Sequence, residues 1–335
     1  MNVAIVGCGL IGRKRALALS SEDKLMACCD TNLESAKKFG KEFDCIFFDD
    51  YKKLLNETDC DVIVVSVVNK YAKEIIIAAL RNGKNVIAEK PLGRNLEEAR
   101  EIVGSKSSVS SKQYVVLKTG FNHRFHPAIW QAKQMAVEGK IGKIFNIRAR
   151  YGHGGRAGME KEWRASKDLC GGGELLDQGV HVIDLIRWFG GEVKEVFGKV
   201  ETKFWKMEVE DNAYAILKTD NDITASLHVS WTNWKNIFSF EIFGTDGYLK
   251  IEGLGGSYGP EVLEFGRRKK EGGKPEIELL EFPSEDVSWK KEWEEFKKAI
   301  GENREPIGSG LDGLKANEVV EAIYRSNAEN RSIVL

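Results

Sequence analysis

Two residues near the middle of the chain have the types and the spacing of a proton-transfer pair. Asp177 and His181 lie four residues apart in a segment predicted to be helical over Glu174–Phe189, so their side chains share one helix face. A carboxylate beside an imidazole raises its basicity and fixes its orientation, as a general base that removes a hydroxyl proton requires. Gly179 lies between them and costs about 1 kcal/mol inside a helix. We expect this glycine to make room for a ligand or for another backbone.

Two other interpretations of this segment remain open. The pair can be an ordinary surface ion pair on a helix. Asp177, His181 and Asp184, which lies three residues after the histidine, can also be metal ligands. No closed set of partners, HExxH motif or cysteine cluster accompanies them, so we expect no metal site.

Polar residues also occur at two other points suited to ligand binding. Glu89-Lys90-Pro91 follows the fifth predicted strand. A lysine at the carboxyl end of a parallel strand lies where ligands bind in open α/β sheets. The segment NHRFHP, residues 122–127, marks the passage between two halves of the chain, where its side chains can line a cleft. The alternatives are a surface lysine at a turn and a solvated linker with salt bridges.

A glycine pattern at the start of the chain has the form of a phosphate-binding loop. GCGLIG, residues 7–12, is a G-x-G-x-x-G that follows an apolar strand and opens an amphipathic helix. Gly7 permits a tight turn, Gly9 lets a pyrophosphate approach the helix N-terminus, and Gly12 allows close helix–strand packing. We predict a dinucleotide site here, with Leu10 and Ile11 in the loop. The alternative is a glycine turn that binds no dinucleotide.

The acidic residue Asp30 indicates which dinucleotide binds. It lies 18 residues after Gly12, at the end of the next predicted strand, where it would accept hydrogen bonds from the adenosine ribose hydroxyls. It would also repel a 2′-phosphate, and the following Thr31-Asn32-Leu33 contains no basic residue. The sequence therefore favours NAD(H) and does not exclude NADP(H).

The elements that must position these residues alternate between strands and helices up to about residue 120. Apolar strands without polar alternation suit a parallel sheet covered on both faces, and repeated strand–helix units give a doubly wound sheet. The predicted strands are Val3–Val6, Leu25–Asp30, Ile46–Phe48, Val62–Ser66, Asn85–Glu89 and Tyr114–Thr119. The predicted helices are Ile11–Leu19, Leu33–Phe43, Tyr51–Leu55, Tyr71–Asn82 and Leu96–Val103. The polar stretch Ser105–Lys112 is predicted to be a solvated loop.

After about residue 120 the composition changes, since all 8 tryptophans lie there. The run Ile223–Trp231 alternates apolar and polar residues, which is typical of an antiparallel strand with one buried face. Other predicted strands are Ile144–Tyr151, Val193–Phe204, Asn212–Lys218, Ile237–Gly244 and Tyr248–Ile251; other predicted helices are Pro127–Glu138, Trp289–Ile300 and Leu311–Asn330. We therefore predict an α/β protein with a Rossmann dinucleotide-binding domain over residues 1–120. An α+β domain with an open, mostly antiparallel sheet is predicted over residues 121–335, for substrate binding and oligomerisation.

Composition excludes several classes of partner. The 335 residues carry 50 Lys plus Arg and 51 Asp plus Glu, and this balance argues against nucleic-acid binding and against a polybasic membrane anchor. The longest apolar runs, Val62–Val68 and Ile75–Leu80, fall far short of a membrane span. The first residues lack the charged region of a signal peptide. Six cysteines without CxxC pairing favour reduced thiols and a cytoplasmic protein.

Taken together, these segments resemble the Gfo/Idh/MocA oxidoreductase family, named for glucose–fructose oxidoreductase and inositol dehydrogenase. The resemblance covers essentially the whole chain. It rests on the glycine loop, the EKP segment, NHRFHP, Glu162-Trp163-Arg164 and the run GGGxxxDxGxHxxD at residues 171–184. EKP followed by that run is specific, whereas the glycine loop alone is not.

The resemblance implies hydride transfer between nicotinamide and a carbohydrate-type hydroxyl or ketone. Lys90 would then hold the substrate oxygen, His181 would be the acid/base and Asp177 would orient the site. Glu89 and Lys90 are also expected near the cofactor. The open sheet of the second domain often mediates oligomers in this family, so we expect a homodimer or a homotetramer.

The chain departs from the family pattern after the fourth predicted strand. Many members carry Thr-Pro-Asn there and a histidine three residues later. This chain has Val67-Val68-Asn69, with Ala72 at the histidine position. Asn69 remains a candidate cofactor contact, but its exact interaction does not follow from the resemblance.

The implied substrate is a sugar, a cyclitol or a nucleotide-sugar. Hydrogen bonds, charge and a stacking face for a sugar can come from Tyr151, His153 and Trp163, and three arginines suit a carboxylate or a phosphate. The candidate substrate-binding residues are Asn122, Arg124, Tyr151, Arg156, Trp163, Arg164, Asp177 and His181. The alternative for each arginine is a solvent-exposed surface ion pair.

Two rival functions use the same fold. One is a non-catalytic protein that senses NAD and sugar, since fold does not fix function. The intact set of Lys90, Asp177 and His181 speaks against it, because a sensor need not keep a proton-transfer set. The other is an enzyme that retains its NAD and uses a transient oxidation to cleave a glycosidic bond.

Overall fold

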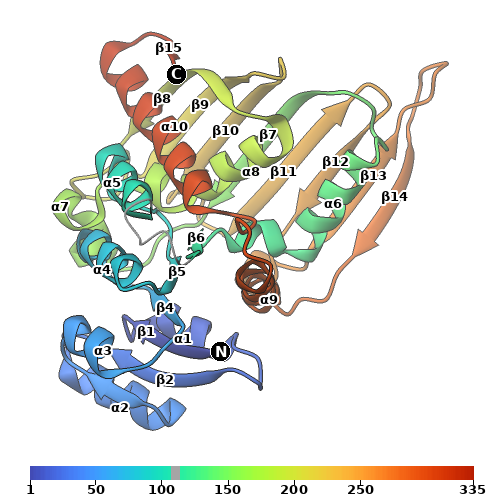
Figure 1. Cartoon of the computed structure of the whole chain (residues 1–335). Helices are drawn as coiled ribbons and strands as arrows, with labels where there is room; N and C mark the ends of the chain where they lie inside the picture. Colours follow the sequence, from blue (N-terminus) through green and yellow to red (C-terminus); the bar gives the residue numbers. More distant parts are fainter. Residues whose placement is uncertain (107–113) are drawn as a thin grey trace. The chain divides into compact units, whose positions relative to one another are not determined.

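The computed structural model describes residues 1–106 and 114–335, which divide into two compact units (Figure 1). Unit 1 comprises Met1–Phe121, Asp168–Gly171 and Trp289–Asn317. Unit 2 comprises Asn122–Lys167, Gly172–Ser288 and Glu318–Leu335. The domains expected from the sequence were continuous, 1–120 and 121–335. The units differ from them because the chain returns to unit 1 twice after residue 121.

Unit 1 contains a six-stranded parallel sheet with the strand order β3-β2-β1-β4-β5-β6. Its strands are β1 Asn2–Val6, β2 Lys24–Cys29, β3 Ile46–Phe48, β4 Val62–Val65, β5 Asn85–Ala88 and β6 Leu117–Thr119. Its helices include α1 Leu10–Leu17, α2 Leu33–Phe43, α3 Tyr51–Glu57, α4 Asn69–Arg81 and α5 Leu96–Lys106. The predicted doubly wound sheet is confirmed. The predicted loop over 105–112 lies outside the described residues, except for the last two residues of α5.

Both faces of this sheet are buried. Along β1, Val3 and Ile5 pack with Ala16 of α1 and Phe39 of α2. The alternate residues of β1 enter a second core, on the face covered by α3, α4 and α5. Helix α9, Ser288–Gly301, inserts Trp293, Phe296 and Ala299 into the first core, which explains why this late segment belongs to unit 1. Apolar side chains on both faces of a strand are typical of a parallel sheet between helices.

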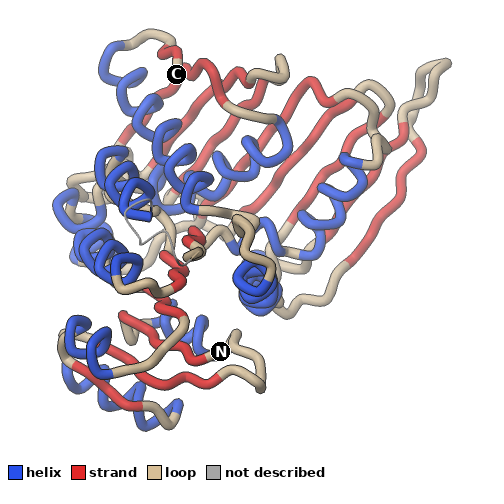
Figure 2. Tube along the Cα trace, in the orientation of Figure 1, coloured by secondary structure: helices blue, strands red, loops and turns tan. Residues whose placement is uncertain are grey.

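Unit 2 is built on a nine-stranded sheet with the order β14-β13-β12-β11-β7-β10-β9-β8-β15. Figure 2 shows the strands of this sheet in red. The first strands are β7 Ile144–Gly152, β8 Val193–Glu201, β9 Asn212–Thr219, β10 Thr224–Ser230 and β11 Ile237–Gly244. The remaining strands are β12 Gly247–Glu252, β13 Val262–Arg267, β14 Glu276–Glu281 and β15 Ile333–Val334. Only the pair β7–β10 is parallel. The predicted open, mostly antiparallel sheet is therefore confirmed, although the last three strands were not predicted.

Helices cover one face of the sheet in unit 2 (Figure 1). These are α6 Pro127–Val137, α8 Val180–Gly190 and the second part of α10 Gly310–Glu329. Gly198 of β8 allows the close approach of α10, because a Cβ there would lie 2.7 Å from Ile323. The opposite face carries exposed residues such as Phe197, Tyr214 and Ile216. Across residues 1–106 and 114–335, every helix is too short or too polar to cross a membrane.

Short elements complete unit 2. They are the 3-10 turns η1 Asn122–Phe125, η2 Met159–Lys161, η3 Trp163–Ala165 and η5 Gly256–Tyr258, and the π-helical turn η4 Leu175–Gly179. The short helix α7, Lys167–Cys170, lies at the point where the chain passes from unit 2 back to unit 1. Five of these elements carry or contact the candidate residues described next.

Candidate active site

The glycine loop of unit 1 joins β1 to α1 through positions that exclude side chains. Gly7 has φ +104°, and a Cβ there would lie 2.5 Å from the carbonyl oxygen of Ser66. A Cβ on Gly12 would lie 2.0 Å from the carbonyl oxygen of Gly7. Gly7 is thus required by its backbone conformation and Gly12 by its close packing.

Gly9 is different, because open space lies beside it. A Cβ on Gly9 would meet no atom of the described residues within 4 Å. Gly9 is also the N-cap of α1, where it offers no side chain to cap the first turn. The N-terminus of a helix carries partial positive charge and directs N–H groups outward. The loop therefore fits a dinucleotide pyrophosphate.

Asp30 ties the glycine loop to the end of β2. Its Oδ2 accepts a hydrogen bond from the Cys8 N–H at 2.9 Å, and its Oδ1 accepts one from the Asn32 N–H at 2.9 Å. Each carboxylate oxygen can accept a second hydrogen bond. Asp30 therefore keeps acceptor capacity for further donors while it holds the loop in place.

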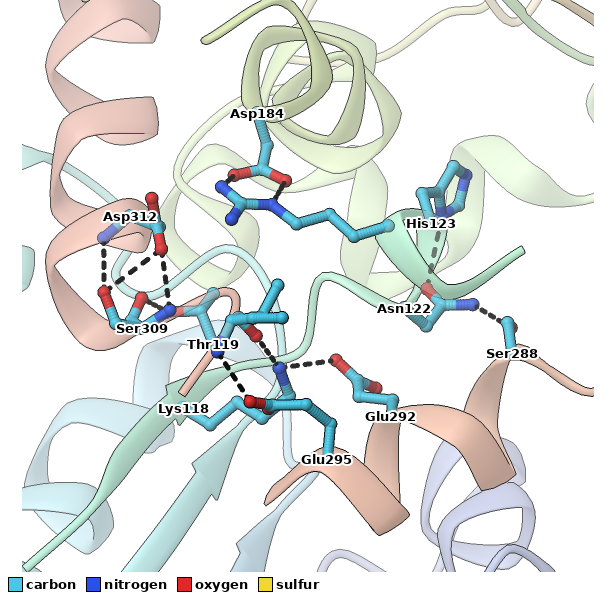
Figure 3. Close-up of polar contacts among 12 residues, drawn as sticks. Lys118, Thr119, Asn122, His123, Asp184, Ser288, Glu292, Glu295, Ser309 and Asp312 are labelled. Atoms are coloured by element: carbon cyan, nitrogen blue, oxygen red, sulfur yellow. Dashed lines mark hydrogen bonds and ion pairs between the residues drawn. The ribbon is translucent and has the colours of Figure 1, made fainter. Parts of the chain in front are cut away.

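Glu89, next to Lys90, belongs to a buried ion network in unit 1. Its Oε1 accepts from Arg15 Nε at 2.6 Å, and Arg15 also donates to Glu292 of α9 at 2.5 Å. Burial raises the pKa of Glu89, against the opposing effect of Arg15. Lys118 lies 3.5 Å from Glu292, and Figure 3 shows this contact. The Glu89 carboxylate thus pairs with the buried Arg15 of α1, which also binds Glu292 of α9. These contacts fix the segment that carries Lys90.

The other candidate cofactor residues have simpler environments. The side-chain amide of Asn69, at the start of α4, donates to the carbonyl oxygen of Cys170 at 2.9 Å. Leu10 is exposed and Ile11 is half-buried at the start of α1. Lys90 is half-buried after β5, and the Lys90–Pro91 peptide bond is cis.

In unit 2, Asp177 and His181 do not lie in one uniform helix. Asp177 is in the π-helical turn η4, and His181 is in the first turn of α8. The chain is helical throughout the predicted range 174–189, with π-helical geometry over Leu175–Gly179. The role expected for Gly179 is wrong, because a Cβ there would lie 3.1 Å from Val229 Cγ2 of β10. The glycine makes room for a side chain of the sheet.

Asp177 has a cationic partner. Its Oδ2 accepts from Arg164 Nε at 3.3 Å, and the Arg164 guanidinium lies 4.3 Å from the centre of the Trp163 ring. Burial lowers the pKa of His153, which also interacts electrostatically with Asp177 and Arg164. The structure thus brings four of the predicted side chains together in unit 2: Asp177, Arg164, Trp163 and His153.

His181 is buried and stacks on His123, with ring centroids 3.8 Å apart and planes inclined by 19°. Asn122, beside His123, donates its amide to Ser288 Oγ at 2.9 Å (Figure 3). Tyr151 meets the His123 ring edge-on at 5.2 Å. Burial raises the pKa of Tyr151 well above its ordinary value, so its hydroxyl stays protonated.

The other two predicted substrate arginines also have carboxylate partners in unit 2. Arg124 is buried and makes a bidentate pair with Asp184, at 2.8 and 2.6 Å (Figure 3). Arg156 is exposed and pairs with Glu162, which matches the surface ion pair considered for it from the sequence. Asp184 therefore binds Arg124, and the described residues contain no cluster of three or more His, Cys, Asp or Glu suited to a metal.

The sequence does not predict three residues that contact the candidate site residues. Tyr258 lies in a part of the chain without a motif, yet its hydroxyl accepts a hydrogen bond from Gln178 at 2.9 Å and its ring centre lies 5.4 Å from that of Tyr151. His123 lies within the NHRFHP motif, but the motif alone does not predict it as a site residue. Arg15 gave no signal at all, since its partner Glu292 is 277 positions away in the sequence.

Comparison with family models gives two matches along the chain. Residues 1–115 match the oxidoreductase family model with an NAD-binding Rossmann fold, and residues 129–250 match the GFO/IDH/MocA C-terminal domain. Together the two matches include the glycine loop, Lys90, Asp177 and His181.

Curated relatives span most of the chain. Levoglucosan dehydrogenase of Pseudarthrobacter phenanthrenivorans is 28% identical over 292 residues, which are 74% of this chain and 73% of that protein. The dTDP-3,4-didehydro-2,6-dideoxy-alpha-D-glucose 3-reductase of Actinomadura kijaniata is 30% identical over 256 residues, 74% of each protein.

Solved structures share the fold. Levoglucosan dehydrogenase in complex with NADH and L-sorbose has a TM-score of 0.90 and 23% identity, covering 100% of this chain and 98% of that one. Aldose-aldose oxidoreductase from Caulobacter crescentus has a TM-score of 0.87 and 23% identity, covering 100% and 99%.

Proposed function

Because the chain belongs to the Gfo/Idh/MocA oxidoreductase family, we propose that it is an NAD-dependent dehydrogenase of a sugar, a cyclitol or a nucleotide-sugar. It is an oxidoreductase with an NAD-binding Rossmann domain. The reaction is oxidation of one hydroxyl, or reduction of the corresponding ketone. Bound NAD would supply the acceptor for the hydride that leaves the substrate carbon.

The proposed chemistry assigns one task to each of three residues. In the oxidative direction, His181 takes the proton of the substrate hydroxyl. Lys90 holds the same oxygen and stabilises the charge that develops on it. Asp177, fixed by Arg164 at 3.3 Å, orients the polar side chains of unit 2. Unit 1 binds the cofactor through the Gly9 opening and Asp30.

The observation that carries this proposal is the glycine loop with open space at Gly9 and with Asp30 bonded to the loop itself. A Rossmann-like fold without a dinucleotide has no need of an unfilled helix N-terminus next to an oriented carboxylate. The preference for NAD(H) over NADP(H) follows from the negative charge of Asp30.

The substrate proposal rests on the polar and aromatic residues of unit 2. The Trp163 ring, with Arg164 over one face at 4.3 Å, is an aromatic surface of the kind on which a sugar ring packs. Relatives named for levoglucosan and for a dTDP-sugar support a carbohydrate-type substrate. The exposed Arg156 suits the phosphate of a nucleotide-sugar if it exchanges Glu162 for that phosphate.

The test is product analysis with the purified full chain. The protein is incubated with NAD and a panel of sugars, cyclitols and nucleotide-sugars, and free NADH is measured by its absorbance. We expect NADH to accumulate with at least one polyol, and ketone substrates to consume NADH. Cleavage of a glycoside without NADH release would identify an NAD-retaining glycosidase. Binding of NADH without turnover of any compound would favour a sensor.

We also propose a homodimer or homotetramer that forms through the open face of the unit 2 sheet. The support is the exposed apolar side chains of β8 and β9 on that face. A cytoplasmic location is proposed from the six cysteines, all of which are free thiols. Neither a nucleic-acid partner nor a membrane partner forms part of the proposal.

A further inference from the structure

The stacked imidazoles of His123 and His181 come from two separate elements of unit 2. His123 lies in η1, and His181 lies in the first turn of α8. Both side chains are buried, and their ring centroids are 3.8 Å apart. A ring held at this distance limits rotation of its partner about the Cβ–Cγ bond.

A chain of hydrogen bonds fixes the ring of His123. The Ser288 hydroxyl donates to Asp286 Oδ1 at 2.5 Å and accepts from the Asn122 amide nitrogen at 2.9 Å. The Asn122 carbonyl oxygen therefore faces Nδ1 of His123, at 3.2 Å (Figure 3). Because that oxygen only accepts, Nδ1 of His123 carries the hydrogen.

We propose that His123 is a positioning residue for His181. The stack holds the plane of the His181 ring, and the two imidazoles are protonated one after the other. This inference rests on the proposed role of His181 as acid/base. Two imidazolium rings at 3.8 Å would repel each other, so the pair takes up its protons in separate steps. The chain from Asp286 to Asn122 transmits this orientation from the segment before α9.

A further imidazole lies beside the pair, because His126 meets the His123 ring edge-on at 5.4 Å and shares a hydrogen bond with Glu261. Tyr151 of β7 and Tyr258 of η5 stay neutral, because burial raises the pKa of both hydroxyls, that of Tyr258 to about 12. The ion pairs of the surrounding elements are Asp177 with Arg164 and Asp184 with Arg124, and Glu174 interacts electrostatically with both tyrosines.

Steady-state kinetics test the positioning role. His123→Leu removes the stacked ring, and we expect kcat to fall by about 10- to 100-fold, with the affinity for NADH unchanged. His123→Phe keeps a flat ring in the stack, and we expect it to restore kcat to within about threefold of the wild type. Trp130→Leu is the matched control, because it breaks the neighbouring stack of Phe125 on Trp130 without touching His181. Equal kcat values for His123→Leu and Trp130→Leu would overturn the proposal.

A histidine titration by NMR tests the shared proton, even if His123→Leu does not fold. The chain has five histidines, so single substitutions assign their ring signals. In the wild type we expect the signals of His123 and His181 to move together in one step, with the second step displaced by more than about one pH unit. In His123→Phe we expect His181 to titrate in a single step. An identical His181 curve in both proteins would contradict the coupling.

The two readouts separate this inference from the proposed function. A wild type that turns over no polyol but shows coupled titration refutes the dehydrogenase and retains the stack. The opposite result is an active wild type, a His123→Leu variant with undiminished kcat, and the same His181 titration curve in the wild type and in His123→Phe. It refutes the positioning role and retains the dehydrogenase.

Discussion

At the residue scale, we assign two tasks to Asp30, of which a neutral acceptor side chain could perform only one. It accepts the Cys8 N–H, which shapes the glycine loop, and in the proposed function its negative charge meets the adenosine ribose. The first task needs only an acceptor atom, whereas discrimination against a 2′-phosphate needs the charge. A substitution that keeps the acceptor and removes the charge therefore isolates the second task.

We predict that Asp30→Asn shifts the ratio of NADH to NADPH affinity toward NADPH by about tenfold, since a like-charge repulsion near a binding site costs roughly 1 kcal/mol or more. Fluorescence energy transfer from tryptophan to bound nicotinamide measures both affinities. The control is Asp61→Asn. Asp61 directly precedes β4 and, like Asp30, accepts a hydrogen bond from a backbone N–H, that of Asn2. An unchanged ratio in Asp30→Asn would refute the role of the charge.

A second carboxylate, Asp23, predicts a pH dependence of stability. Burial opposes its ionisation, but hydrogen bonds from the amino-terminal group, Ser20, Trp293 and Lys297 hold its pKa below the ordinary value. A depressed pKa in the folded state stabilises the fold above about pH 4, and this contribution is lost as the pH falls. We predict that Asp23→Asn lowers the free energy of unfolding in urea at pH 7 by more than it does near pH 3. Equal losses at both pH values would contradict the prediction.

Side chains of the candidate site could be predicted from the sequence where a motif carried them, but their partners could not. Asp177 and His181 were found by spacing, yet the contacts of Asp177 with Arg164 and of His181 with His123 needed the fold. The spacing of Asp184 from His181 allows it to be a metal ligand, but in the structure its carboxylate binds Arg124. Long-range pairs leave no local trace in the sequence.

At the scale of the elements, the β1–α1 junction assigns opposite constraints to neighbouring glycines. Gly12 is packed against the backbone of Gly7, whereas Gly9 faces open space in the described structure. The first constraint concerns the fold, and the second concerns the ligand.

We predict that Gly12→Ala lowers the free energy of unfolding by about 1–3 kcal/mol, because its Cβ would overlap the carbonyl oxygen of Gly7. Gly9→Ala should leave the unfolding free energy nearly unchanged and weaken NADH binding by about tenfold or more, because the methyl group occupies the approach of the phosphates. Gly104→Ala in α5, where a Cβ also meets open space, is the control for NADH binding. Normal NADH affinity in Gly9→Ala would count against this placement of the cofactor.

Elements with strong local patterns were predictable, and those set by tertiary packing were not. All six strands of the parallel sheet were predicted, because buried strands are short apolar runs between turns. The π-helical turn at Leu175–Gly179 has no pattern of its own and packs against β7, β9 and β10. Strand β14 has exposed side chains at nearly every position, so it lacks the alternation by which a half-buried strand is recognised.

At the scale of the whole molecule, the open face of the unit 2 sheet determines the proposed assembly. Phe197 of β8 lies opposite Ile216 of β9, and their side chains are 46% and 56% exposed. We predict that wild-type protein sediments as a dimer or tetramer, and that Phe197→Glu combined with Ile216→Lys yields monomers. Val137→Lys, at an exposed apolar position on α6, is the control. A monomeric wild type would refute the assembly.

The most direct test of the account compares turnover and cofactor binding in His181→Ala. The assay uses the polyol that gives the highest rate of NADH formation, together with an NADH titration of the same protein preparation. Loss of the acid/base should lower kcat by about 100- to 10,000-fold. The dissociation constant for NADH should stay within about twofold, because the glycine loop and Asp30 belong to unit 1. Equal losses of both quantities, or an unchanged kcat, would contradict the assignment of His181.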